Sequence, residues 1–144
     1  MRSTARRRVR VVTFGAVDLP AVRAEVAAAF AAYEVALIAN DAAALGRFFW
    51  DDPRAIRYGA GENLHGAAAI AAFRAQRGAG DLARDLARTT ITCFGEDFAT
   101  ACTLFRRRES GRTGRQMQCW ARLPEGWRIV AAHVSLLDFS WPKG

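Results

Sequence analysis

The stretch GRQMQCWARLPEGWRIVAAHVSLL, residues 114–137, predicts a β-hairpin and thereby the fold class of the second half of the chain. Residues 114–123 and 127–137 are rich in β-branched and aromatic residues, and PEG supplies the turn between them. Two earlier runs, 84–94 and 98–107, have the same character, and the sequences GED and ESGRTG provide the other two turns. Four strands joined by short turns indicate an antiparallel meander.

The first half of the chain predicts three helices. The first begins after Asp18, a candidate N-cap, with Pro20 tolerated in its first turn, and Asn40 ends it. Asp41 can cap a second, shorter helix, and a third helix follows Gly66. The apolar stripe of the first helix consists of Val22, Val26, Ala29, Phe30, Tyr33 and Leu37. Helices followed by an antiparallel sheet indicate an α+β fold.

The basic charge of the chain is concentrated at its beginning. The formal net charge is +7, and five arginines within the first ten residues leave +2 for the rest. We therefore predict one domain over residues 18–140 after a basic, disordered tail over residues 1–17, with a polyanion-binding arm as the alternative. Nucleic-acid binding by the domain itself is not expected. No apolar run approaches the ~18–20 residues of a membrane span, and no signal-cleavage motif follows the tail, which favours a cytoplasmic location.

Strand alternation assigns the two faces of the last hairpin. One face carries Arg122 and Arg128 near the turn, and two adjacent arginines indicate a face that meets solvent or another subunit. The same face carries Gln116, Gln118 and Trp120. The opposite face, which carries Met117, Cys119, Ala121, Ile129, Ala131 and His133, is therefore expected to be the core.

Three polar residues fall among apolar ones in this arrangement. Arg57 lies in the short strand AIRY, where a guanidinium needs either a bound anion or an internal ion pair with Glu62 or Glu34. Both interpretations remain open from the residues alone. Tyr33 has a ring suited to the buried stripe and a hydroxyl that can donate to a substrate or to an internal partner. His133, alone on the presumed core face, is more typical of a structural histidine than of a functional one.

Stronger signatures of catalysis or metal binding are absent from the sequence. There is no G-x-S-x-G elbow, no H-E-x-x-H and no Walker glycine loop, and the two histidines do not suggest a metal cluster. Cys93, Cys102 and Cys119 are widely spaced in strand-like runs, which is typical of buried, inert thiols. Any chemistry is therefore expected to need no cofactor and no metal.

Several long segments resemble one known family. The run YEVALIANDAAALGRFFWDDPRAIRYGAGENLHG from Tyr33, the stretch FRAQR from Phe73, and the hairpin sequence quoted above are similar to the AtzH/HpxZ-like family. These are small bacterial proteins of the nuclear transport factor 2-like (SnoaL-like) superfamily. The resemblance implies a cone-shaped α+β fold in which three helices pack into a curved antiparallel sheet. It also implies homodimers through the outer face of the sheet, for which the face with Gln116, Gln118 and Trp120 is the candidate.

The resemblance further implies an activity. Family members belong to bacterial pathways that break down nitrogen-rich compounds, often beside an amidase-signature enzyme, and an amidase activity on dicarboxyurea is proposed for one of them. The family's catalytic tyrosine and arginine match Tyr33 and Arg57. We therefore expect a small anionic substrate such as a ureido carboxylate, bound by Arg57 with secondary contacts from Asn63, Arg74 and His133. The alternative is a non-catalytic ligand-binding accessory protein of a neighbouring amidase.

Overall fold

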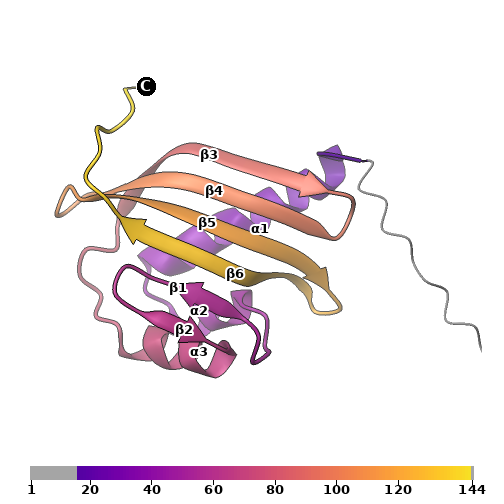
Figure 1. Ribbon diagram of the computed structural model, residues 1–144, viewed down its shortest axis with the longest axis horizontal. Coiled ribbons are helices and arrows are strands. Elements are labelled where there is room, and N and C mark those ends of the chain that lie inside the picture. The colour runs from indigo at the N-terminus through magenta and orange to yellow at the C-terminus, as the bar shows by residue number, and fades with distance from the viewer. Residues whose placement is uncertain (1–15, 144) are drawn as a thin grey trace, which may run out of the picture.

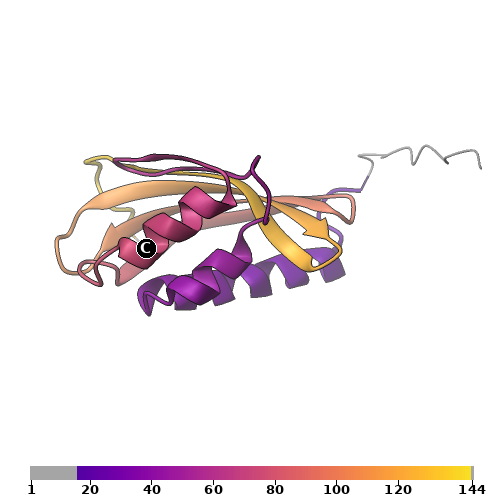
Figure 2. The ribbon, with the colours of Figure 1, turned by 90° about the horizontal axis from the view of Figure 1, so that it is seen from below.

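The computed structural model describes residues 16–143, which form one six-stranded sheet with three helices on one of its faces (Figures 1 and 2). The helices are α1 (Pro20–Ile38), α2 (Ala42–Phe48) and α3 (Ala67–Gln76). The strands are β1 (Ile56–Tyr58), β2 (Asn63–His65), β3 (Arg84–Phe94), β4 (Phe98–Arg107), β5 (Thr113–Leu123) and β6 (Gly126–Leu136). The order across the sheet is β2-β1-β6-β5-β4-β3. None of the helices within residues 16–143 is long and apolar enough to cross a membrane.

The predicted meander is confirmed, because β3 to β6 pair in sequence order and antiparallel. The sheet is wider than predicted. Strand β1 pairs in parallel with β6 and antiparallel with β2, a three-residue strand that the sequence did not predict. The register places Arg57 opposite Ala132 of β6 and Leu64 of β2. Arg57 is therefore an internal residue of the sheet and not the end of an isolated strand.

Helix α1 buries the predicted stripe, but Asp18 does not cap it. The N-cap is Leu19, which makes no side-chain capping bond. Asp18 has a positive φ of 56°, its backbone N–H donates to the Cys93 carbonyl at 2.9 Å, and its Oδ1 accepts from the Cys93 N–H at 2.8 Å. This residue thus fastens the chain to the end of β3 instead of starting the helix. The predicted cap at Asp41 is confirmed by the 3.1 Å bond from the Ala44 N–H.

The first described residues, 16 and 17, lie on the tail side of the boundary predicted before residue 18. Val17 forms an antiparallel bridge with Phe94, and the Gly95 N–H donates to the Ala16 carbonyl at 2.8 Å. The folded domain therefore includes residues 16 and 17. Of the tail predicted over residues 1–17, residues 1–15 lie outside the described residues.

The assignment of the two hairpin faces was wrong. Gln116, Gln118 and Trp120 are at most 2% exposed and face the helices, whereas Met117 is 60% exposed and His133 is exposed on the opposite face. The predicted interface residues therefore lie in the interior, and a homodimer through the outer face of the sheet stays a prediction.

A β-bulge explains the error in β6, whereas the error in β5, where Gln116, Gln118 and Trp120 alternate without interruption up to Arg122, came from the arginine argument. The register of β5 and β6 passes from Cys119 opposite Ala131 to Trp120 opposite Ile129, which leaves Val130 as an extra residue. Strict alternation through such a point exchanges the two faces. The arginine argument also failed, because Arg122 near the turn is satisfied locally: its guanidinium lies 2.7 Å from a Glu25 carboxylate oxygen.

Candidate functional site

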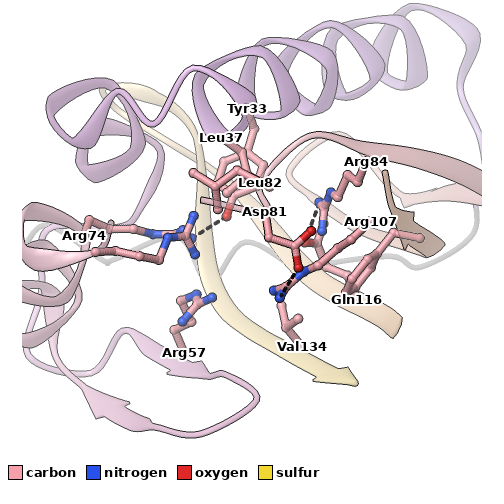
Figure 3. Close-up of a pocket in the computed structure, with 12 residues that line it drawn as sticks. Tyr33, Leu37, Arg57, Arg74, Asp81, Leu82, Arg84, Arg107, Gln116 and Val134 are labelled. Carbon is pink, nitrogen blue, oxygen red and sulfur yellow. Dashed lines mark hydrogen bonds and ion pairs between the residues drawn. The ribbon is translucent and has the colours of Figure 1, made fainter. Parts of the chain in front are cut away.

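A small cavity lies between α1, the end of α3 and the concave face of the sheet (Figure 3). Its lining residues come from α1, from the end of α3 and the loop that follows it, and from strands β1, β3, β4, β5 and β6, and five of the twelve are arginines. The lining residues are Tyr33, Leu37, Arg57, Arg74, Arg77, Asp81, Leu82, Arg84, Phe105, Arg107, Gln116 and Val134. Figure 3 shows Arg57 and Arg74 on one side, with Arg84, Arg107 and Gln116 on the other.

Tyr33 enters the cavity from the buried face of α1. Its side chain is 2% exposed, and its ring packs edge-on against Phe48 and Phe49, which fixes its direction. The phenol oxygen accepts a hydrogen bond of 2.6 Å from Nη2 of Arg74. Since a guanidinium has no acceptor atom, the phenol hydrogen remains available for another group.

Arg57 reaches the cavity from the middle of β1 and is 5% exposed. Its Nη1 donates to Oε1 of Glu62 at 2.7 Å, and its guanidinium carbon lies 5.2 Å from the centre of the Phe73 ring. The internal ion pair with Glu62 is therefore present, while the pair considered with Glu34 is not the one formed. Arg57 also lines the cavity.

Arg84 is the most completely bonded arginine of the cavity. Both Nε and Nη2 donate to the carboxylate of Glu34, the first at 3.1 Å, and Nη2 also donates to Oε1 of Gln116 at 2.9 Å. Its guanidinium carbon lies 4.6 Å from the centre of the Phe105 ring. Such bidentate pairing with a buried carboxylate holds α1 to β3.

Arg74 and Arg77 differ from Arg84 because most of their buried donors have no partner. Nε and Nη1 of Arg74, and Nε and Nη2 of Arg77, make no hydrogen bond with any described residue. Burial is the main cause that lowers the pKa of Arg74. Burial, followed by the nearby charges of Arg74 and Arg57, lowers the pKa of Arg77 to about 10. Both guanidiniums remain charged at neutral pH.

The charges around the cavity do not balance. Glu62 pairs with Arg57, Glu34 with Arg84, and Asp81 lies 3.6 Å from Arg107. Those three ion pairs leave Arg74 and Arg77 as two positive charges without a carboxylate among the described residues. An enclosed site with excess guanidinium is suited to a small anion.

The predicted site residues divide between the two faces of the sheet. Tyr33, Arg57 and Arg74 line one cavity, whereas Asn63 and His133 do not reach it. Asn63 and His133 both lie directly opposite Tyr58 in the register, and residues that face each other across strands point to the same side. Because neighbouring side chains alternate, that side is the one away from Arg57. The core position predicted for His133 is therefore wrong.

The sequence argument missed Arg77 and Gln116 as site residues. Arg77 follows Arg74 by three residues at the end of α3, and two like charges at that spacing lie on one helix face. That spacing was a usable signal. Gln116 gave none, because the alternation placed it on the outer face.

Other chemistry is not assembled in the described part of the chain. Residues 16–143 contain no group of three or more His, Cys, Asp or Glu side chains placed to hold a metal ion. Cys93 is buried and Cys102 and Cys119 are half-buried, and all three are free thiols. Burial raises the pKa of each, so these thiols are protonated at neutral pH.

The fold and the cavity define a protein of the nuclear transport factor 2-like class, whose solved members share this sheet over helices. A nuclear transport factor 2-like protein with a cystatin-like fold from Novosphingobium aromaticivorans is similar, with 29% identity and a TM-score of 0.65 over 83% of this chain and 84% of that one.

Two further solved structures are more similar. A protein with unknown function from Pectobacterium atrosepticum is 53% identical, with a TM-score of 0.82 over 85% of this chain and 95% of that one. A cystatin-like fold protein from Burkholderia xenovorans is 47% identical, with a TM-score of 0.83 over 87% of this chain and 98% of that one. The sequence model of the AtzH-like family matches residues 15–140, and the chain belongs to that family. No curated protein matches the sequence.

Proposed function

We propose that this protein is a small cofactor-free amidohydrolase that acts on a ureido carboxylate of the dicarboxyurea or oxalurate type. The observation that carries the proposal is the pair formed by Tyr33 and Arg74. A buried phenol with an uncommitted hydrogen lies beside a buried guanidinium whose Nε and Nη1 lack acceptors. A planar anion with a carbonyl group can satisfy both at once.

The residues have separate roles in the proposed reaction. Arg57 and Arg74 bind a carboxylate of the substrate and fix its orientation, which lowers the entropic part of the barrier. In hydrolysis, a water oxygen adds to the carbonyl carbon, the C–N bond breaks, and the departing nitrogen takes up a proton. Tyr33 donates its hydrogen to the carbonyl oxygen or to that nitrogen, while the cationic Arg74 at 2.6 Å stabilises negative charge on the phenol oxygen.

A second candidate function is that of a non-catalytic ligand-binding protein that accompanies an amidase. One observation favours it: each carboxylate at the cavity is close to an arginine, Glu62 to Arg57, Glu34 to Arg84 and Asp81 to Arg107. An ion-paired carboxylate is a weak general base, so activation of water has no obvious agent among these residues. In that case the same cavity would retain the ligand without turnover.

The test compares the two tyrosines of the chain. Purified wild-type protein is incubated with dicarboxyurea and with oxalurate, and released ammonia and carbon dioxide are measured. Tyr33→Phe is expected to reduce turnover by about 10²-fold or more, as loss of a proton donor does. Arg57→Lys, which keeps the charge but not the planar fork, is expected to have an effect of similar size.

Tyr58→Phe is the matched control, because Tyr58 lies on the outer face, where its ring contacts those of His65 and His133. It should retain wild-type turnover. Full activity in both Tyr33→Phe and Arg57→Lys would refute the catalytic assignment. Thermal stabilisation of the wild type by a ureido acid without any product would favour the accessory function.

A further inference from the structure

Besides the unpaired donors of Arg74, the cavity contains unpaired donors that the proposed function does not use. They are Nε and Nη2 of Arg77 and Nε2 of Gln116, which are buried and make no hydrogen bond with any described residue. These groups come from the end of α3 and from the concave face of β5.

The position of Arg77 is fixed by its backbone. It is the C-cap residue of α3, its N–H donates to the Phe73 carbonyl at 3.1 Å, and its own carbonyl accepts from Nδ2 of Asn40 at 3.2 Å. The side chain is thus directed to the cavity by the fold, although the guanidinium itself has no bond that would hold it there.

The amide of Gln116 has its orientation fixed as well. Arg84 donates to Oε1 at 2.9 Å, so the oxygen end of the amide is occupied and the NH2 end is presented as a donor. Gln116 is 2% exposed, and a buried donor without an acceptor destabilises a protein. A feature that lowers stability in this way is expected where a ligand supplies the missing acceptor.

One negative charge does not neutralise the site. Arg74 and Arg77 are both without a carboxylate partner, and the positive charge of Arg74 is one cause of the lowered pKa of Arg77. A monoanion bound at Arg74 would leave Arg77 unpaired in the same cavity. A dianion would supply an acceptor for each.

The geometry points to a second carboxylate subsite formed by Arg77 and Gln116, which makes the ligand of this cavity a dicarboxylate and these two residues its specificity determinants. Arg57 and Arg74 hold the first carboxylate. The inference rests on the proposed function only for the idea that the cavity binds a carboxylate, and it does not require catalysis.

The test uses a pair of probes that contain no amide or ester bond. Glutarate has two carboxylates separated by the same number of atoms as those of dicarboxyurea. In 5-oxohexanoate, an acetyl group of nearly the same shape replaces one carboxylate. Affinities are measured by titration calorimetry at neutral pH in a buffer free of phosphate and sulfate.

The wild type is expected to bind glutarate at least about tenfold more tightly than 5-oxohexanoate, since hydrogen bonds to charged groups exceed 1.4 kcal/mol. Arg77→Gln should reduce this ratio to about one by weakening glutarate alone. Gln116→Leu should reduce it in the same direction by a smaller factor. Arg23→Gln, which removes the same charge from the exposed surface near the start of α1, should leave the ratio unchanged.

Several results would overturn the inference. Equal affinities of the wild type for the two probes, absence of glutarate binding, or an unchanged ratio in both Arg77→Gln and Gln116→Leu would each do so. If Arg77→Gln fails to fold, as judged by circular dichroism, Gln116→Leu decides alone. A protein that prefers glutarate through Arg77 but hydrolyses no ureido acid would refute the proposed function and leave this inference intact.

Discussion

Arg84 and Arg77 line the same cavity, but they differ in how many of their guanidinium donors have hydrogen-bond partners. Arg84 donates to Glu34 and to Gln116 and stacks on Phe105. Arg77 has two buried nitrogens without an acceptor among the described residues, and its guanidinium carbon lies 6.0 Å from the centre of the Phe73 ring. A guanidinium with a full set of partners stabilises the fold, whereas one without them lowers stability until a ligand binds.

The difference shows that buried arginines of one cavity can be told apart by their unsatisfied donors. The number of arginines in the cavity does not distinguish structural residues from binding residues, because all five are cationic. The count of unsatisfied donors does distinguish them. Arg57 is intermediate, because it is paired with Glu62 and still lines the cavity.

The largest expected effect is that of Arg84→Met. The substitution leaves Glu34, which is 8% exposed, as a buried carboxylate without its partner, and the free energy of unfolding should fall by about 3–5 kcal/mol. Urea denaturation measures the change. Arg54→Met breaks an exposed pair with Asp52 and should alter stability far less. Similar losses in both variants would contradict the structural role given to Arg84.

Arg77→Met is expected to act in the opposite direction. Removal of an unpaired, partly buried charge should raise the free energy of unfolding by about 1 kcal/mol in buffer without anions, or Tm by about 3 °C. The same variant should lose the stabilisation that glutarate gives to the wild type. Differential scanning fluorimetry with and without glutarate measures both quantities. A clearly lower Tm without ligand would mean that Arg77 has structural partners after all.

The smallest effect is expected from Gly59→Ala. A Cβ at this position would lie 1.7 Å from Oε1 of Glu62 and 2.9 Å from Nη1 of Arg57, so the Glu62 carboxylate must move away. Arg57 would then resemble Arg77, and the affinity for glutarate should rise a few-fold.

The matched control for this change is Gly61→Ala, two residues further along the same turn. A Cβ at Gly61 has no atom within 4 Å, so its introduction should change neither affinity nor stability appreciably. If Gly59→Ala weakened glutarate binding, Glu62 would be an aid to ligand binding and not a competitor for Arg57.

The sequence predicted most elements of the fold because their signals are local. Four long strands with clear turns and a nineteen-residue helix with an apolar stripe were identified nearly to the residue. The three-residue strand β2 was not, since its pairing with β1 is determined by the sheet around it. The face assignment failed in β6 at Val130, because a bulge has no sequence signature of its own here, and in β5 because the partner of Arg122 is Glu25 of α1, a distant segment.

Prediction of the site was limited in the same manner. Tyr33 and Arg57 were identified as polar residues among apolar ones, the family resemblance supplied their expected catalytic role, and the structure brings both to the cavity. Whether an arginine is paired depends on contacts between distant segments, such as the one that joins Glu34 to Arg84 across fifty positions of the chain. No local pattern contains that information, so the distinction between Arg84 and Arg77 needed three-dimensional coordinates.

The extra residue at Val130 shifts the alternation of side chains along β6 by one position. On one side of it the strand presents Ile129 to the helices, and on the other Ala132 takes that place, opposite Arg57. Strict alternation of the same residues without the bulge would turn His133 inward where Ala132 now lies. Removal of Val130 itself would instead restore regular pairing and keep both faces as they are. A deletion at this point should therefore be better tolerated during evolution than a deletion elsewhere in β6.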